Sequence, residues 1–392
     1  MNQKLFHLLL RPIEAVLASI SPIIDQQALS QKLFFADFVR KLLFAYLEQV
    51  SSLRSLSVEL QTNQKCQALG LADTPFSTLK DGFYRFSSEA CRTLFETVLS
   101  ELNLKRIKGL DEIGLFRVID GSLFPTLIRM SWSEYRKRKN AFKLHLNFEL
   151  NRMIPTEFLI GSGKSSERDF LLKVLEQGVT YIADRGYASF EIIAKLLNAH
   201  AYFVFRVKDN LLYEVLEVLS LGVEELPKCF HQVRDELVIF KHDKHQNCVR
   251  LIQFRVAGSY FRLITNRFEL SRLQIIILYA YRWQIELFFK YLKRTLNGLH
   301  LFNHSENGVG IQFYLLMTLA LLLLKFKQQR ESPKNKKKEK VEKNEANPSE
   351  WIKKISEIFY ESWKISKKWL LIVKNSLSKV VDNELFTLLD SC

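Results

Sequence analysis

The sequence predicts an α/β protein in which a mixed sheet is flanked by helices and preceded by an all-helical region. Apolar residues recur at helical spacing through the first hundred residues, as at Leu33, Phe38 and Leu42. From about residue 115, short β-branched and alternating runs replace that pattern. Strand-like and helix-like segments then alternate along the chain, and that order is typical of a sheet covered by helices.

The expected sheet is built from four segments before residue 208. We predict strands over residues 115–119, 142–150, 181–183 and 202–207, and helices over residues 166–177 and 190–199. In the second strand Lys143, His145 and Asn147 alternate with apolar residues. This alternation predicts a strand with one buried face and one polar face.

A β-rich insertion is expected at about residues 209–262, where two strand-like runs flank a polar loop. A long helix should follow over about residues 272–296. The apolar run 313–324 has 12 residues, whereas a membrane span needs about 20. We therefore predict that this run is a buried core helix and that the protein does not enter a membrane.

Four regions follow from these patterns. We expect a helical region at 1–108, a domain of sheet and helices at 109–326 that contains the insertion, a lysine-rich linker at 327–350, and a helical segment at 351–392.

Composition narrows the class of partner and the compartment. The 392 residues include 57 Lys and Arg against 42 Asp and Glu, which gives a formal charge of +15. Such a surplus favours a polyanionic partner, either nucleic acid or an anionic membrane surface. The five cysteines form no C-x-x-C pair, which argues against a disulfide scaffold and fits a reducing cytoplasm.

Three carboxylates lie at positions that are typical of a ligand-binding or catalytic site. Asp120 and Asp184 each end a short apolar run, and strand ends are where a sheet presents side chains to a ligand. Taken alone, each aspartate is more often a turn residue. Glu286 lies within the helical segment 279–293, among bulky apolar neighbours.

Glu286 shares a helical stripe with a phenol and two cations. At 3.6 residues per turn, Tyr279, Arg282, Glu286 and Lys293 fall within about 60° of arc. An ordinary surface pair of Arg282 and Glu286 would contribute only about 0.3–0.5 kcal/mol. The aromatic surroundings favour a half-buried carboxylate that meets a metal, with Tyr279, Arg282 and Lys293 holding phosphates.

The ligand types indicate which metal is expected. Three carboxylates without a Cys or His set suit a hard cation, Mg²⁺ or Mn²⁺. Two such ions about 3.5–4 Å apart can activate a nucleophile and stabilise the leaving oxygen at a phosphodiester. We therefore expect two ions bound by Asp120, Asp184 and Glu286.

The spacing of these residues resembles a known family. Tyr279-x2-Arg282-x3-Glu286-x6-Lys293 is similar to the Y-R-E-K signature of bacterial DDE transposases of the insertion sequence four group. The segment 120–122, Asp-Gly-Ser, resembles the first aspartate motif of that group, and 183–187, Ala-Asp-Arg-Gly-Tyr, resembles the second. The resemblance covers roughly residues 30–325.

The resemblance implies an RNase H-like fold interrupted by a β-strand insertion. It also implies a DNA endonuclease activity in cut-and-paste transposition: cleavage at the ends of the protein's own element, and strand transfer into target DNA. The partners would be the terminal inverted repeats and target DNA, both double-stranded, held by a dimer. A helix–turn–helix would place Ser77, Thr78 and Lys80 against DNA; Arg185 and His145 are further candidate DNA contacts.

A second class of function stays open on sequence alone. A catalytically inactive protein descended from a transposase would keep DNA binding and lose cleavage. Either protein would be expected in the bacterial cytoplasm, associated with the nucleoid.

Overall fold

The N-terminal region is a group of six helices. The computed structural model describes residues 3–26, 32–126, 130–136, 139–219, 230–256, 259–296 and 298–338. The helices are α1 (Gln3–Gln26), α2 (Phe35–Leu47), α3 (Leu53–Thr62), α4 (Gln64–Ala68), α5 (Phe76–Arg85) and α6 (Ser88–Glu101). Hydroxyl and amide side chains set where several of them begin, since Ser52, Asn63 and Ser87 each accept a hydrogen bond from a first-turn backbone N–H.

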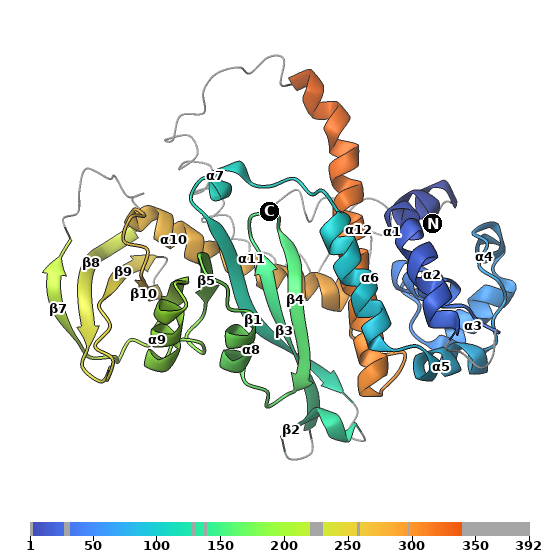
Figure 1. The fold of residues 1–392 in the computed structure, drawn as a ribbon, viewed down its shortest axis with the longest axis horizontal. Helices are drawn as coiled ribbons and strands as arrows, with labels where there is room; N and C mark the ends of the chain where they lie inside the picture. Colours follow the sequence, from blue (N-terminus) through green and yellow to red (C-terminus); the bar gives the residue numbers. More distant parts are fainter. Residues whose placement is uncertain are drawn as a thin grey trace.

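A ten-stranded mixed sheet follows the short helix α7 (Lys108–Asp111) and forms the centre of the molecule (Figure 1). Its strands are β1 (Leu115–Thr126), β2 (Glu134–Arg136), β3 (Lys139–Glu149), β4 (Ile154–Ser162), β5 (Val179–Ala183), β6 (Tyr202–Arg206), β7 (Tyr213–Val218), β8 (Phe230–Phe240), β9 (Val249–Val256) and β10 (Ser259–Thr265). The order is β2-β3-β1-β5-β6-β10-β9-β8-β7, with β4 also paired to β3. β1 is antiparallel to β3 and parallel to β5, which is parallel to β6.

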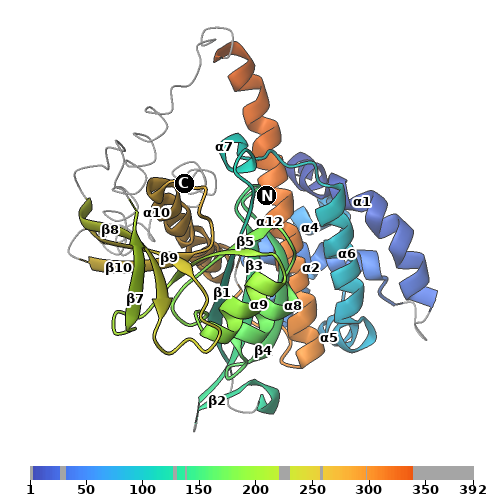
Figure 2. The same ribbon diagram turned by 60° about the vertical axis from the view of Figure 1, so that its left-hand side comes forward.

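Helices cover both faces of this sheet (Figure 2). Val118 and Ile182 belong to the core shared with α10 (Arg272–Tyr281), α11 (Trp283–Lys290) and α12 (Glu306–Lys338). Ile119 and Tyr181 belong to the core shared with α8 (Glu167–Lys173) and α9 (Phe190–Asn198). Successive strand residues point to opposite faces. Later residues of β1 at even numbers therefore point to the face of Val118, and those at odd numbers to the face of Ile119.

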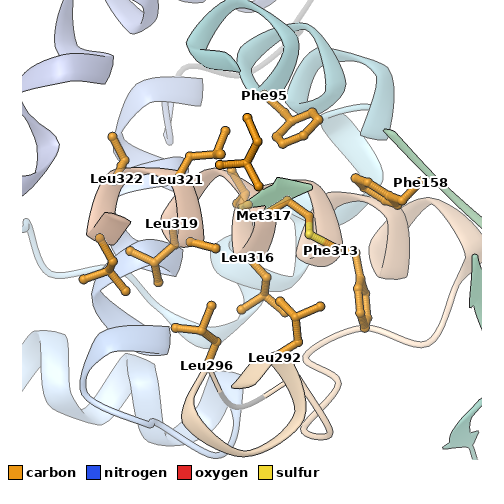
Figure 3. Packing of buried hydrophobic residues seen from close by; sticks show 14 of the residues in the cluster. Phe95, Phe158, Leu292, Leu296, Phe313, Leu316, Met317, Leu319, Leu321 and Leu322 are labelled. Atoms are coloured by element: carbon orange, nitrogen blue, oxygen red, sulfur yellow. The ribbon is translucent and has the colours of Figure 1, made fainter. Parts of the chain in front are cut away.

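The apolar run 313–324 lies inside α12, between the N-terminal helices and the sheet (Figure 1). Figure 3 shows Phe313, Leu316 and Met317 among side chains from α6, β4 and residues 292–296. Two helices of the described chain, Phe6–Gln26 and Glu306–Phe326, are long and apolar enough to cross a membrane. Because 83% of the second is buried inside the protein, it is the core helix that its length predicted.

Removing a central aromatic ring from this core should be costly. Phe313 is fully buried, and its ring centroid lies 5.0 Å from Phe124 and 5.3 Å from Phe142. Phe313→Ala is expected to lower the free energy of unfolding by about 3–5 kcal/mol, measured by denaturant titration. Leu299→Ala is the control, because Leu299 is 45% exposed and should change stability by less than about 0.5 kcal/mol.

Several elements differ from the sequence prediction. β3 is buried on both faces, since His145 and Asn147 are fully buried; α8 covers the face that carries these polar side chains. β1 continues through Asp120 to Thr126, because β3 pairs with it along that whole stretch. α8 is shorter than predicted and begins after its cap, Ser166.

Two further corrections concern the second half of the chain. The predicted insertion is β-rich, and β7, β8 and β9 extend the main sheet beyond β10. The helix of the apolar run continues to Lys338, so residues 327–338 are helical where a linker was expected. Lysine and glutamine at 327–329 are good helix formers and prolong a helix already anchored in the core, which then continues through Pro333 to Lys338. The predicted segment 351–392 lies outside the described residues.

Candidate active site

Asp120 and Asp184 lie on neighbouring parallel segments: Asp120 is in the middle of β1, just beyond its pairing with β5, and Asp184 follows the carboxyl end of β5. Val118 of β1 is paired with Ile182 of β5, and each aspartate comes two residues later on its own segment. Both therefore point to the face that Val118 and Ile182 share with α10 and α11. The side chain of Asp120 is 23% exposed.

Arg282 joins Glu286 to this pair of strands. It stands at the break between α10 and α11, and its Nη2 lies 2.7 Å from Oε1 of Glu286. Its Nη1 lies 3.6 Å from Oδ2 of Asp120. The hydroxyl of Tyr279, one turn earlier, donates to Oδ1 of Asp184 at 3.2 Å. Arg282 therefore bridges Glu286 and Asp120, and Tyr279, whose ring centre lies 5.8 Å from the Arg282 guanidinium, contacts Asp184.

Lys293 reaches the same strand from the end of the helical segment. Residues Tyr291–Thr295 form a turn of π-helix, a feature often found at functional sites. The Nζ atom of Lys293 donates to Oγ of Ser122 and to the carbonyl of Leu123, both at 2.8 Å. It also lies 4.6 Å from the centre of the Phe124 ring. Lys293 is therefore fixed two to three residues beyond Asp120.

Burial and neighbouring charges shift the protonation of these groups. Burial raises the pKa of Asp120 to about 6; the Gly121 N–H and Arg282 oppose this shift, and Glu286 adds to it. Burial likewise raises the pKa of Tyr279 to about 12. Burial alone would lower the pKa of Arg282, but Tyr279 and Glu286 more than offset it. A cation between Asp120 and Glu286 offsets the repulsion between their two carboxylates.

The three carboxylates match a hard divalent ion in the kind of donor atom that they offer. Asp120, Asp184 and Glu286 offer only carboxylate oxygens, the ligand type of Mg²⁺ and Mn²⁺. The place of a cation between Asp120 and Glu286 is taken by the Arg282 guanidinium. In the described part of the chain, no three His, Cys, Asp or Glu side chains lie close enough to hold a metal. The three carboxylates are suitable ligands for a hard cation, but the Arg282 guanidinium lies between those of Asp120 and Glu286.

The remaining candidate residues are distributed unevenly. His145 is fully buried and its Nε2 lies 2.7 Å from Oγ of Ser165, so a direct DNA contact is not available to it in this structure. Arg185 is half-buried beside Asp184. On α5 the side chains of Ser77 and Lys80 are exposed and Thr78 is half-buried, far along the chain from the carboxylates.

Sequence reasoning missed Glu167 and the role of Lys143. Lys143 Nζ lies 3.2 Å from Oε1 of Glu167, just behind Asp120. The sequence signal for Glu167 was a glycine inside each aspartate motif, Gly121 and Gly186, because both glycines leave room for the Glu167 carboxylate.

Comparisons with known proteins show which family this chain resembles. Residues 114–323 match the family model described as Transposase DDE domain. A transposase of insertion sequence element IS5377 from Geobacillus stearothermophilus is 25% identical over 259 residues, which is 65% of this chain and 68% of that protein. The transposase y4zB of Sinorhizobium fredii is 26% identical, covering 54% of this chain and 60% of its own length. The transposase of element IS4SA from Synechocystis is 26% identical, covering 60% and 66%.

Among solved structures, the piggyBac transposase synaptic complex with hairpin DNA matches 98% of this chain and 83% of that chain, with 11% identity and a TM-score of 0.43. This match is too distant to support an argument. The match to the family model, which spans more than half of the 392 residues, shows that the chain belongs to the DDE transposases. The resemblance to insertion-sequence transposases is thereby confirmed, and the function of this class is DNA transposition.

Proposed function

We propose that this protein cleaves the ends of its own element in a Mg²⁺-dependent reaction and joins the freed 3′-hydroxyls to target DNA. The observation that supports it most is that one helical segment contacts carboxylates from three separate parts of the chain: Arg282 lies between Glu286 and Asp120, and Tyr279 donates to Asp184. Two cations of this segment, Arg282 and Lys293, contact Glu286 and Ser122. Carboxylates for metal and cations for phosphate are what such chemistry requires.

The topology supports an RNase H-like core for this chemistry. Reading across the sheet, β4, β3 and β1 are antiparallel neighbours, and β5 and β6 continue parallel to β1. We infer that these five strands form the catalytic core, with β7, β8 and β9 as its insertion. Asp184 follows the carboxyl end of β5, where ligands of such sheets bind, and Asp120 lies within β1 just beyond its pairing with that strand.

The chain's own residues have distinct tasks in this reaction. Asp120, Asp184 and Glu286 would hold two divalent ions, which supply an activated nucleophile and stabilise the leaving oxygen. Arg282 now neutralises two of these carboxylates, and its planar guanidinium would turn to a phosphate when DNA arrives. Lys293, fixed to β1, would hold a second phosphate as a point charge.

DNA-end recognition is assigned to the N-terminal helices. Ser77 and Lys80 lie on the exposed side of α5, which follows the short helix α4. We infer that α5 contacts the inverted repeat and that two protomers hold two ends in the active complex. A chain of charge +15 would then be concentrated on the nucleoid by its phosphate contacts.

Arg282 and Lys293 should affect the affinity for DNA more than the affinity for the metal ions. Arg282→Ala and Lys293→Ala are expected to weaken the complex with cleaved ends about tenfold or more, since a charge-assisted phosphate bond contributes roughly 1.5–3 kcal/mol. Gel-shift titration measures this affinity, and calorimetric Mn²⁺ titration measures metal binding. Arg152→Ala is the control, because Arg152 pairs with Glu149 away from the carboxylates. An equal loss of both affinities would contradict the phosphate role.

The proposed function is tested by supplying the purified protein with a DNA carrying the element and its flanks. With Mg²⁺ the element should be excised, and EDTA should stop excision. Binding to the end sequences should weaken steeply with salt, because phosphate contacts release counterions. Salt-sensitive binding without excision would indicate the inactive DNA-binding alternative, and salt-insensitive binding would contradict a DNA partner.

A further inference from the structure

A polar cluster lies behind the site, on the face of the sheet opposite Glu286. Lys143 of β3 donates through Nζ to Oε1 of Glu167 at 3.2 Å and to the carbonyl of Ser165 at 3.3 Å. Glu167 opens α8, the helix that covers this face. The side chains of Lys143 and Glu167 are only 16% and 30% exposed. The ion pair is therefore held inside the fold, next to the end of β1.

The Glu167 carboxylate lies beside a glycine of each aspartate motif, in the space that a side chain there would occupy. A Cβ built on Gly121 would lie 3.3 Å from Oε1 of Glu167, and a Cβ built on Gly186 would lie 3.0 Å from Oε2. Gly121 follows Asp120, and Gly186 comes two residues after Asp184. Neither glycine has a positive φ, so the requirement at both positions is for space. One carboxylate thus packs against two segments that carry catalytic aspartates.

The neighbouring residue of α8 anchors the second of these segments. Nε of Arg168 donates to the carbonyl of Gly186 at 3.1 Å. Inside the turn, the N–H of Tyr187 donates to the carbonyl of Asp184 at 3.1 Å. Tyr187 is itself buried. Arg168 thus attaches the turn that begins at Asp184 to the first turn of α8.

We propose that Glu167, held by Lys143, is a positioning residue that sets the separation of Asp120 and Asp184. The inference rests on the proposed function, because that function gives the separation its importance. Without the carboxylate, the two backbones would lose the group packed between them and could move relative to each other. Misplacement of reacting groups by about 1 Å can cost about 10²-fold in rate.

The test compares Glu167→Ala, Glu167→Gln and the control Asp169→Ala. Asp169 lies in the same helical turn but is exposed. We measure the Kd for Mn²⁺ by electron paramagnetic resonance, and kcat and KM for end cleavage. Glu167→Ala should raise the Kd about tenfold and lower kcat about 10–100-fold, with KM for DNA unchanged. Glu167→Gln keeps the shape and an acceptor for Lys143, so it should remain close to the wild type, as should Asp169→Ala.

Each outcome decides the matter. If Glu167→Ala has the same Mn²⁺ affinity and kcat as the Asp169→Ala control, the proposal is overturned. It is also overturned if Glu167→Ala and Glu167→Gln are equally impaired. If the wild type binds Mn²⁺ but cleaves no DNA, the proposed function fails and the Mn²⁺ affinities alone decide the role of Glu167. A wild type that binds no Mn²⁺ overturns both.

A metal-free measurement tests the contact itself. Gly186→Ala should give a lower thermal midpoint, relative to its parent, in the wild type than in Glu167→Ala, because the new methyl group would lie 3.0 Å from Glu167 Oε2. In the Glu167→Ala background the same change should have little effect, which gives a coupling between the two positions. Identical losses in both backgrounds contradict the packing on which the proposal rests.

Discussion

Alanine in place of Asp120, Asp184 or Glu286 is expected to abolish strand cleavage while end binding persists. Each carboxylate is a proposed ligand of the divalent ions, and none lies among the N-terminal helices assigned to the DNA ends. Removing one electrostatic group from an active site commonly costs about 10²–10³ in rate, and loss of a metal ligand should cost at least as much. Gel-shift titration of end binding and a strand-cleavage assay measure the two effects separately.

Glu176→Ala is the matched control for these variants. Glu176 pairs with Arg117 at 2.5 Å and is 54% exposed, so its loss removes a carboxylate without touching the site. Its cleavage rate should equal that of the wild type. Cleavage at the wild-type rate by all three alanine variants would reject the assignment of metal ligands. Loss of DNA binding by all three would instead place the carboxylates in a structural role.

Local pattern was sufficient to propose these residues as candidates. The apolar run before each aspartate predicted a strand, and the two strands are parallel neighbours that bring Asp120 and Asp184 together. The predicted strand end at Asp120 is wrong, because pairing with β3 continues β1 to Thr126. Helical spacing placed Tyr279, Arg282 and Glu286 on one stripe, and in the structure Arg282 does contact Glu286. Both inferences depend on nearest neighbours in a regular element, which sequence periodicity encodes directly.

What periodicity could not predict depends on tertiary packing. The polar face of β3 looked solvent-exposed, but α8 covers it and buries His145. The helix around Glu286 looked continuous, but it breaks at Arg282 and ends in a π-helical turn. That turn brings Lys293 to Ser122. Glu167 could not be predicted because its proposed role depends on its proximity to Gly121 and Gly186, and only the folded chain brings these residues together.

Asparagine at position 120 is expected to stabilise the metal-free protein above pH 6. The pKa of Asp120 is raised by burial to about 6 from 3.8, so the folded state binds more protons than the unfolded state between those values. Stability contributed by the protonated form is complete below about pH 4 and is lost as the pH rises through 6. Because asparagine does not ionise, Asp120→Asn removes this loss.

At pH 8 in EDTA, Asp120→Asn should raise the free energy of unfolding by about 1–3 kcal/mol, since one pKa unit corresponds to about 1.4 kcal/mol. At pH 4 the difference from the wild type should largely disappear. Chemical unfolding at both pH values measures it, with Asp169→Asn as an exposed control. A destabilised variant at pH 8 would mean that attraction to Arg282 outweighs the burial of the charge. A gain at pH 8 would show that this carboxylate is kept for its chemistry at the expense of stability.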